Sequence, residues 1–543
     1  MAVIKDTDDF LIKENIIEIL HSKEDNSINS WDQIPSPFLF KDMKKAVELY
    51  SYALSNNMKI KMVHDSDADG LGTYLESWYF YTEFYYKNIE LIIVDRKEGY
   101  GLLPKHMEEN CLVITSDNGI TAIDACRRAK DFQNCKVIIT DHHQVDSHFG
   151  LPEADAIINP WVPGETFPYK EINGTFVYWF FLKAIQETYQ FQFNMWNFLP
   201  ELTLTTISDV MPLIHINRFI VKQGLVFMPQ SNRRWVKTFL HTHSLTEVLA
   251  EDLAFKIIPS INVTNRLTKA DESALFLIQE DHILSTQWFG YINNLNNQRK
   301  KMQETLFKTI ELKYKQWLDQ PFIIIPGNEA DGFHKGILGP TAGRLVEKYK
   351  KPALVLCNHN GVLSGSGRSI GKVDILGIVK GNEFVNQNKT GGHKVACGVS
   401  LNMSTLNQFW NHCQTEVSKL PAEQFEGTAF VMGKMNIRDI DLDLYYDIKK
   451  FEPFGEAYER PTFLIRGKAK DVKKLGKDGT HISFHLEDGL GARIKCLFFF
   501  ASDPIKANTN YSLICTIQHD SFNNADNVCL FVKSVAGFKD FQE

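Results

Sequence analysis

Three aspartates stand at alternate positions in the run VHDSDADG at residues 63–70. They follow a short apolar segment and precede a glycine, so the run ends a strand and opens a turn. Carboxylates held this close repel one another, and a folded protein keeps them together mainly when a cation compensates their charge. The spacing of Asp65, Asp67 and Asp69 therefore predicts a divalent-metal site.

The same letters also resemble the start of a calcium-binding loop. Such a loop carries a bidentate Glu at its twelfth position, and Glu76 stands there when Asp65 is counted first. The residues LGTYL just before Glu76 have the composition of an apolar helix, which argues against a calcium loop. A solvated acidic turn is the second alternative. The VHDSDADG run by itself leaves both the calcium loop and the solvated acidic turn open.

Three further segments carry the same kinds of side chain. Asp209, in ISDVMPL, stands between apolar residues, where an unpaired carboxylate would cost several kcal/mol, so it is expected to have a partner. A neutral imidazole beside carboxylates suits borderline cations such as Mn²⁺, and a neighbouring Asp can orient one of its ring nitrogens. Single histidines are more often hydrogen-bonding partners in a core than ligands. The remaining candidates are Asp117 in TSDNG and Asp141, His142 and His143 in ITDHH.

The elements that must position these residues are short strands alternating with helical segments. Aliphatic runs bounded by polar residues predict a buried, mainly parallel sheet of the βαβ kind. In such sheets the sites lie at the carboxyl ends of the strands, which is where Asp65, Asp95, Asp117 and Asp141 stand. The predicted strands are 59–63, 91–94, 111–115, 136–140 and 156–158, and the predicted helices are 73–86 and 121–130.

The second half of the chain predicts three more parts. Residues 283–318 carry apolar positions at helical spacing and predict a long helix that connects two lobes. A second α/β region follows, and after Pro461 alternating apolar and polar residues predict a small β-barrel. We expect an α/β fold of two lobes joined by this helix, followed by the barrel. The second lobe has predicted strands at 322–325 and 353–356, a helix at 341–350 and a Gly/Ser-rich stretch at 361–371, and the barrel has turn signals at 477–479 and 487–489.

Composition narrows the class of protein. A chain of 543 residues exceeds what one hydrophobic core usually supports, so two to four domains are expected. The net charge of -7 excludes a uniformly basic nucleic-acid coat, although a local channel is compatible with it. The nine cysteines form no CxxC pair, which argues against zinc and against a disulfide framework. Without a long apolar run or a signal segment, we expect no membrane association and a cytoplasmic protein.

The ordered set DxDxDG, SDNGIT, TDHH and SDVMPL resembles the DHH phosphoesterases, and specifically the RecJ family. The resemblance covers roughly residues 55 to 543. Three departures stand out: Asn265 in place of a Gly, Lys335 in place of a Pro, and NGT at 173–175 in place of a Gly-rich helix start. Further matching segments are Arg96 with EGYGL at 98–102, PSIN at 259–262 with Arg266, FHKGILG at 333–339, GSGRS at 365–369, GGH at 391–393 and FEPFG at 451–455.

The resemblance implies two divalent cations, Mn²⁺ first and Mg²⁺ as the alternative. Asp117 would bridge them, and Asp65, Asp67, Asp69, His142 and Asp209 would complete the ligands. His143 would face the phosphate while Asp141 orients a neighbouring His, and His393 would act as a further catalytic donor. The implied substrate-binding residues are Arg96, Arg266, Arg368, Ser366, Gly391 and Gly392. For each of the three arginines, a surface or interlobe ion pair is the alternative role.

The implied activity is hydrolysis of single-stranded DNA from the 5′ end to mononucleotides, in DNA repair or recombination. The barrel resembles an OB-fold, whose basic groove and aromatics commonly hold single strands. The expected partners are single-stranded DNA and either a single-strand-binding protein or a helicase, with the chain itself a monomer. Candidate barrel contacts are Lys468, Lys470, Lys473, Lys474, Lys477, Phe484 and Phe498 to Phe500, and a solvated lysine face is the alternative.

Two other functions compete with this one. A DHH phosphodiesterase of short oligonucleotides or cyclic dinucleotides would share the acidic cluster, but such relatives lack the barrel and the connecting helix. A non-catalytic single-stranded-DNA-binding scaffold would have little reason to keep six metal-site residues. The expected domains are an N-terminal extension at 1–50, the DHH domain at 51–282, the helix at 283–318, an accessory DHHA1-like domain at 319–430, a linker at 431–460 and the OB-like domain at 461–543.

Overall fold

The computed structural model divides into two compact units. The 25–299 unit also includes residues 453–459, and the 300–543 unit comprises residues 300–452 and 460–543 together with the residues up to Glu24. The boundary between them falls inside the long helix α13 (His282–Lys313). The structure describes residues 10–24, 27–84, 86–95, 98–145, 150–425, 431–476, 479, 481–499, 501, 504–520 and 527–535.

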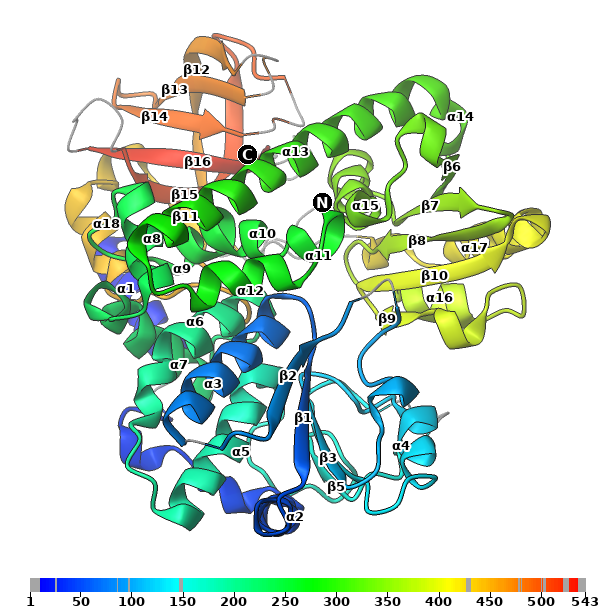
Figure 1. Ribbon diagram of the computed structural model, residues 1–543. Helices are drawn as coiled ribbons and strands as arrows, with labels where there is room; N and C mark the ends of the chain where they lie inside the picture. Colours follow the sequence, from blue (N-terminus) through cyan, green and yellow to red (C-terminus); the bar gives the residue numbers. More distant parts are fainter. Residues whose placement is uncertain are drawn as a thin grey trace. The chain divides into compact units, whose positions relative to one another are not determined.

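A five-stranded sheet forms the centre of the 25–299 unit. Its order is β2-β1-β3-β4-β5, and every neighbouring pair is parallel, as the sequence predicts (Figure 1). The strands are almost continuously apolar because helices cover both faces. The strands are β1 (Lys59–His64), β2 (Ile89–Ile93), β3 (Cys111–Ser116), β4 (Lys136–Thr140) and β5 (Ala156–Ile158).

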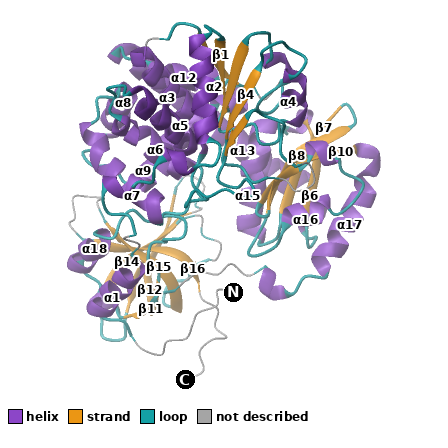
Figure 2. Ribbon diagram, turned by 90° about the horizontal axis from the view of Figure 1, so that it is seen from below, coloured by secondary structure: helices purple, strands orange, loops and turns teal. Residues whose placement is uncertain are grey.

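Alternate strand residues enter two different cores. Ile60 and Met62 of β1 pack with α2 (Met43–Ser55) and α5 (Gly174–Tyr189), whereas Val63 packs with α4 (Ile123–Ala129). Figure 2 shows α2 and α5 on one side of these strands and α4 on the other. The other helices of this unit are α3 (Ala68–Phe84), α6 (Leu199–Ser208), α7 (His215–Phe227), α8 (Arg234–His243), α9 (Ala250–Asp252), α10 (Ile258–Ile261), α11 (Thr264–Leu267) and α12 (Asp271–Ile278).

The segment 453–459 belongs to the 25–299 unit although it lies far along the chain. The backbone N–H of Leu213 donates to the carbonyl of Glu456 at 2.8 Å. Buried Arg218 donates from Nη1 to the carbonyl of Pro453 at 2.8 Å, and its guanidinium stacks 4.0 Å from the ring centre of Tyr458. These contacts hold the segment on the loop and helix that follow Asp209.

The first sheet of the 300–543 unit has the order β6-β7-β8-β10-β9, with β6 and β7 parallel and the other pairs antiparallel. The Gly/Ser-rich stretch, for which the sequence predicts no strand, forms β8 here. A Cβ at Gly365 would lie 1.9 Å from the carbonyl oxygen of Val355, so the small residues allow close strand pairing. The elements are β6 (Ile323–Asn328), α15 (Lys335–Tyr349), β7 (Ala353–His359), β8 (Val362–Arg368), α16 (Ile375–Lys380), β9 (Gly391–His393), β10 (Ala396–Asn402) and α17 (Leu406–Ser418), preceded by α14 (Lys315–Leu318).

A closed five-stranded barrel, consistent with an OB fold, forms the end of the chain. The strands run β12-β13-β14-β16-β15, and pairing of β12 with β15 closes the barrel. Residues 431–460, predicted to be a linker, instead contain β11 (Gly433–Met435), which pairs with β12, and α18 (Leu442–Lys449). Lys477 and Asp478 of one predicted turn lie outside the described residues. The barrel strands are β12 (Phe463–Leu475), β13 (His481–Glu487), β14 (Arg493–Phe498), β15 (Asn510–His519) and β16 (Val528–Val535).

The predicted extension at 1–50 is divided between the two units. Helix α1 (Lys13–Lys23) packs on α18, where Lys13 pairs with Asp447 at 2.6 Å, and Leu11 N–H donates to Lys434 at 2.8 Å. Residues from 27 onward lie in the 25–299 unit. Across the described parts of the chain, no helix has the length and apolar character needed to cross a membrane.

Candidate metal centre

Seven predicted side chains converge at the carboxyl edge of the parallel sheet. Asp65, Asp117 and His142 follow β1, β3 and β4, because parallel strands end at the same edge. Asp67 and Asp69 lie at the start of α3, and Asp209 caps the end of α6. Their ligand atoms form three overlapping groups, each within 4.8 Å: Asp65, Asp67 and Asp117; Asp69, His142 and Asp209; Asp117, His142 and His143.

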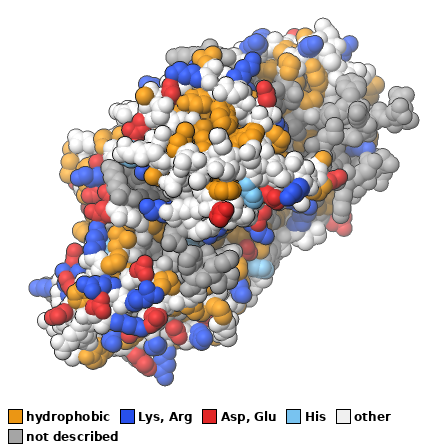
Figure 3. All heavy atoms as spheres, turned by 90° about the vertical axis from the view of Figure 1, so that its right-hand side faces the viewer, with side chains coloured by type: hydrophobic (Ala, Val, Ile, Leu, Met, Phe, Trp, Pro, Cys, Tyr) orange, Lys and Arg blue, Asp and Glu red, His pale blue; other side chains and the backbone are white. Residues whose placement is uncertain are grey.

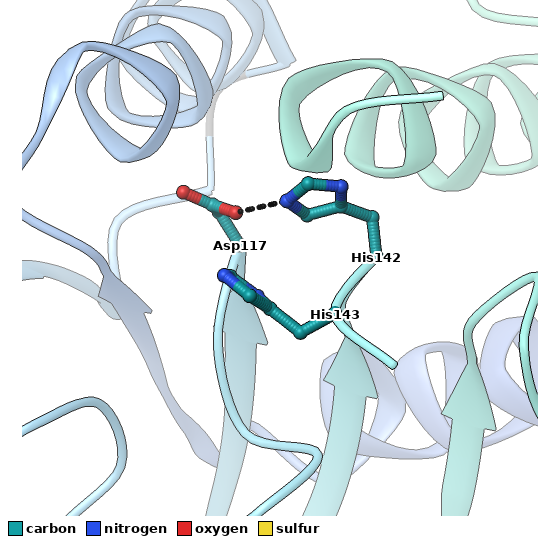
Figure 4. A group of neighbouring side chains, drawn as sticks. All are labelled: Asp117, His142 and His143. Carbon is teal, nitrogen blue, oxygen red and sulfur yellow. Dashed lines mark ion pairs between the residues drawn. The ribbon is translucent and has the colours of Figure 1, made fainter. Parts of the chain in front are cut away.

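The His142 ring points toward the Asp117 carboxylate, with His143 beside them (Figure 4). Its Nε2 atom is 3.3 Å from Oδ1 of Asp117, 3.5 Å from Oδ2 of Asp209 and 3.8 Å from Oδ2 of Asp69. Burial lowers the pKa of His142 to about 3, so the ring is neutral at physiological pH. A neutral imidazole among carboxylates is the donor set that borderline divalent cations prefer.

Asp117 shows that the cluster fits a cation. Its backbone has φ +60°, a left-handed conformation that Asp tolerates better than most residues, and its side chain is buried. Its Oδ1 has no hydrogen-bond partner among the described residues. Burial and then the neighbouring Asp69 and Asp67 raise the pKa of Asp117 well above its ordinary value. A buried carboxylate oxygen without a hydrogen-bond partner is costly, and a divalent cation supplies both the charge and the coordination that it lacks.

The start of α5 holds Asp69 in place. Gly174 N–H donates to Oδ2 of Asp69 at 2.7 Å, and Thr175 donates to Oδ1 from its N–H at 3.0 Å and its hydroxyl at 2.6 Å. The partial positive charge of a helix N-terminus also favours a carboxylate here. Burial nevertheless raises the pKa of Asp69 to about 6, against the effect of these hydrogen bonds.

Gly174 has a role that the sequence did not reveal. A Cβ at this position would lie 2.3 Å from Oδ1 of Asp117, so only glycine lets α5 approach the cluster. The signal was the run NGT at 173–175, in which Asn173 caps the helix by accepting from Phe176 N–H at 3.0 Å. In the sequence, this run stands out only as a departure from the Gly-rich helix start of the resembled family.

Asp141 orients His143. One of its oxygens, Oδ1, accepts from Nδ1 of His143 at 2.7 Å and from the N–H groups of His142 and His143, while Oδ2 accepts from Ile120 N–H at 2.8 Å. Burial alone would raise the pKa of Asp141, but the His143 and His142 rings and the Ile120 N–H lower it below its ordinary value. Burial alone would lower the pKa of His143, but Asp141 raises it to about 9. With Nδ1 engaged, Nε2 is the nitrogen left to face the cluster.

A polar cavity of about 190 Å³ opens beside these ligands. Asn262 fixes one wall, because its Oδ1 accepts from Ala68 N–H at 2.8 Å between two of the aspartates. The predicted Arg266 lines the same cavity, whereas Arg96 lies outside the described residues. The lining residues are Asp67, Asp69, Ser208, Asp209, Asn262, Asn265 and Arg266.

The remaining predicted substrate residues form an array within the 300–543 unit. Arg368 of β8 and His393 of β9 both stand opposite Ala396 of β10, one on each side. Ser366 and Gly391 likewise stand on either side of Gly398. Gly392 lies between Gly391 and His393 on β9 and has a φ of +134°. A Cβ at this position would lie 2.5 Å from the carbonyl oxygen of Ala396. The register thus gathers all five residues on the two strands that flank β10.

The barrel surface corrects part of the prediction. Lys468, Lys473 and Lys474 are exposed on β12. Phe484 and Phe498, predicted to stack on bases, are 1% and 3% exposed and belong to the barrel core. Their positions alternate inward on β13 and β14. Phe499 is exposed instead, packed edge-on against His481 and Phe531, and Phe500 lies outside the described residues.

Charge is mixed on the molecular face in Figure 3, where positive and negative side chains are interspersed. This agrees with the net charge of -7. Attraction of a polyanion therefore depends on local groups such as the β12 lysines and on cations bound by the acidic cluster. The cluster itself is a site for divalent metal.

Three family models match consecutive parts of the chain. They are the DHH family N-terminal domain at residues 59–196, the DHHA1 domain at 320–419 and the RecJ OB domain at 410–534. The chain is 28% identical over 523 residues to the single-stranded-DNA-specific exonuclease RecJ of Bacillus subtilis, covering 92% of this chain and 64% of that protein. It is 26% identical to the Haemophilus influenzae protein of the same name, covering 83% and 82%.

Solved structures show the same fold. RecJ of Thermus thermophilus in complex with Mn²⁺ matches with a TM-score of 0.76 at 21% identity, over 92% of this chain and 72% of that one. The exonuclease RecJ bound to manganese matches with a TM-score of 0.58 at 25% identity, over 71% and 96%. The three matched domains follow one another in the order predicted from the motifs.

Proposed function

Because the chain belongs to the RecJ family, we propose that it is a metal-dependent exonuclease that hydrolyses phosphodiester bonds of single-stranded DNA. The observation that carries this proposal is the convergence of five aspartates and two histidines at one sheet edge. We further propose that cleavage runs from the 5′ end and releases mononucleotides, in DNA repair or recombination. The chain would act as a monomer, with a single-strand-binding protein or a helicase as partner.

We propose that the cluster binds two divalent cations and that Asp117 would be a ligand of both. Mn²⁺ is the first candidate for these cations and Mg²⁺ the alternative. When bound, the cations would activate a water and stabilise charge on the attacking and leaving oxygens. The chain's own contribution is to hold the ligands. Asp69 is fixed by the start of α5, and Asp117 is pressed against Gly174, so neither carboxylate needs to reorganise on metal binding. The full set of ligands is Asp65, Asp67, Asp69, Asp117, His142 and Asp209.

His143 would donate from Nε2 to a non-bridging phosphate oxygen. Its ring orientation is set by the hydrogen bond from Nδ1 to Asp141. Arg266, from the cavity wall, is a second candidate donor. The β8–β10–β9 array would bind phosphate through the Arg368 guanidinium and His393, with Ser366, Gly391 and Gly392 allowing close backbone approach. Arg96 completes the proposed set.

The barrel would hold the strand away from the cleavage point. Exposed Lys468, Lys473 and Lys474 are suited to phosphates and exposed Phe499 to base stacking. Contacts of this kind raise affinity without changing the bond-breaking step.

The decisive experiment follows product length against time on long single strands labelled at either end, with Mn²⁺ present. Early release of labelled mononucleotide from the 5′-labelled strand is expected, with the 3′-labelled strand shortening gradually. The variant Asp117→Asn serves as the inactive control. Cleavage confined to oligonucleotides of a few residues would instead favour the short-oligonucleotide phosphodiesterase, and binding without cleavage would favour a scaffold.

A further inference from the structure

A second acidic pair lies buried in the 25–299 unit, between α3 and α6. Glu76 of α3 is 0% exposed and Glu201 of α6 is 1% exposed. Among the described residues, neither carboxylate oxygen of Glu76 has a hydrogen-bond partner, and Oε2 of Glu201 has none either. Two carboxylates in a protein core are costly unless both their charge and their hydrogen-bonding capacity are satisfied. The metal centre does not use this pair.

The two glutamates lie on helices that pack against each other, and Glu201 acts electrostatically on Glu76. The helices come into close contact at Gly72, where a Cβ would lie 2.4 Å from Cγ2 of Thr205. Glu76 lies one turn further along α3 and Glu201 one turn earlier along α6. Since α3 and α6 run antiparallel here, these one-turn steps bring the two carboxyl groups to the same level.

The antiparallel direction follows from the metal ligands at the other end of the same interface. Asp69, three residues before Gly72, and Asp209, four residues after Thr205, both lie within 4 Å of the His142 ring nitrogen, at 3.8 and 3.5 Å. Seven residues separate Asp69 from Glu76, about 10 Å along the helix axis. The buried pair is therefore two turns away from the metal ligands but on the same two helices.

Among the described residues, Glu201 has a charged hydrogen-bond partner and Glu76 has none. Oε1 of Glu201 accepts from Nε of Arg233 at 3.0 Å and from Nε1 of Trp235 at 3.2 Å. The ionisable groups that act on Glu76 are Asp69 of α3, Glu201 of α6, Arg233 and the Tyr178 hydroxyl of α5. Burial, then Glu201, raises the pKa of Glu76 well above its ordinary value, and Arg233 opposes this.

A proton satisfies this site better than a metal ion. Ca²⁺ takes about six to eight oxygen ligands, whereas the pair offers three unengaged carboxylate oxygens among the described residues. One proton on Glu76 leaves the Glu201 carboxylate paired with the Arg233 guanidinium and brings the three groups to neutrality. The Glu76 hydroxyl can then donate to Oε2 of Glu201, which supplies a partner to both.

We propose that Glu76 and Glu201 share one proton across the α3–α6 interface, and that this proton positions Asp69 and Asp209 for metal binding. Loss of the proton places two like charges face to face in the interface and spreads the two helices that carry these ligands. Glu76 and Glu201 are positioning residues and do not contact the substrate. The inference rests on the proposed metal ligands but not on the proposed nuclease activity.

The first test compares thermal unfolding of the full chain and of Glu76→Gln, without metal, from pH 5 to pH 9. The amide keeps a donor toward Glu201 but does not titrate. A group whose pKa is raised on folding contributes stability that is lost as pH rises from its unfolded pKa toward its folded one. The unfolding temperature of the wild type should therefore fall relative to that of Glu76→Gln across this window. If the unfolding temperatures of the wild type and of Glu76→Gln changed in parallel with pH, the proposal of a shared proton would be wrong. Glu83→Gln, at an exposed position on the same helix, is the matched control and should follow the wild type.

The second test measures Mn²⁺ affinity by electron paramagnetic resonance under argon over the same pH range. Ionisation of ligands that do not interact with Glu76 affects all variants alike, so the ratio of wild-type to Glu76→Gln affinity reports the buried pair together with its coupling to Asp69. The ratio should fall at least about threefold, or about 0.7 kcal/mol, between pH 6 and pH 9. A constant ratio would overturn the positioning role. If Glu76→Gln does not fold, Glu76→Met replaces it, because it fills the same space and also removes the titration.

Discussion

Replacing Gly174 by Ala tests whether α5 holds the metal ligands as described. The added Cβ would lie 2.3 Å from Oδ1, 2.5 Å from Cβ and 2.6 Å from Cγ of Asp117. Ordinary contacts begin at about 3.4 Å, so either the helix start or the Asp117 carboxylate must move by about 1 Å. Asp117 cannot simply rotate away, because its other neighbours are the cluster ligands.

A displacement of about 1 Å at a catalytic group can cost on the order of 10² in rate. We therefore expect Gly174→Ala to lower kcat by about that factor and to weaken metal affinity, since Asp69 and Asp117 are displaced together. Stability should change little, because Gly174 lies at the first residue of α5 and Ala is the better helix former.

The assay measures kcat on single-stranded DNA, Mn²⁺ affinity and the unfolding temperature for Gly174→Ala and for Gly290→Ala. Gly290 also lies in a helix, but a Cβ there meets nothing within 4 Å. The control should keep wild-type activity. If Gly174→Ala kept kcat and Mn²⁺ affinity within twofold of wild type, the proposed contact between α5 and the cluster would be refuted.

Three other changes test separate parts of the proposal. Asp117→Asn should abolish cleavage while leaving the unfolding temperature nearly unchanged, and His142→Ala should lose activity that higher Mn²⁺ concentrations partly restore; activity independent of metal would remove both from the ligand set. His393→Ala should lower kcat on the order of 10² with unchanged Mn²⁺ affinity, as for the loss of one positioned donor, and lost metal binding would contradict that role. Replacing Lys468, Lys473 and Lys474 together by Ala should raise KM for long strands and reduce the slope of log KM against log salt, with little effect on kcat; an unchanged salt slope would remove the β12 lysines from the DNA path.

The sequence predicts the metal site better than the surfaces around it. Asp65, Asp117 and His142 could be placed because parallel strands end at one edge, so position after a strand implies proximity in space. Gly174 could not, because its importance comes from a contact with Asp117 that is 57 residues away and appears only in the folded chain. Support of a site by a helix start leaves little trace in composition.

The sequence also could not show toward which face of a strand a side chain points. Phe484 and Phe498 lie near a lysine-rich strand in sequence, yet both point into the barrel, since a shift of one residue along a strand reverses the face. The glycines and serines of β8 reduce its strand propensity, and only pairing on both sides makes it a strand. The segment 431–460 looked like a linker because β11 is only three residues long.

The return of residues 453–459 to the 25–299 unit has a consequence for biosynthesis. This segment receives the backbone hydrogen bond of Leu213, four residues after Asp209, and is stacked on Arg218. The ribosome must therefore add the 160 residues between positions 299 and 459 before the unit can close. At about 5–20 residues per second this takes roughly 8 to 32 seconds, during which the loop after Asp209, a proposed metal ligand, lacks its final contacts. The nascent chain thus completes its metal centre only after most of the second unit has been made.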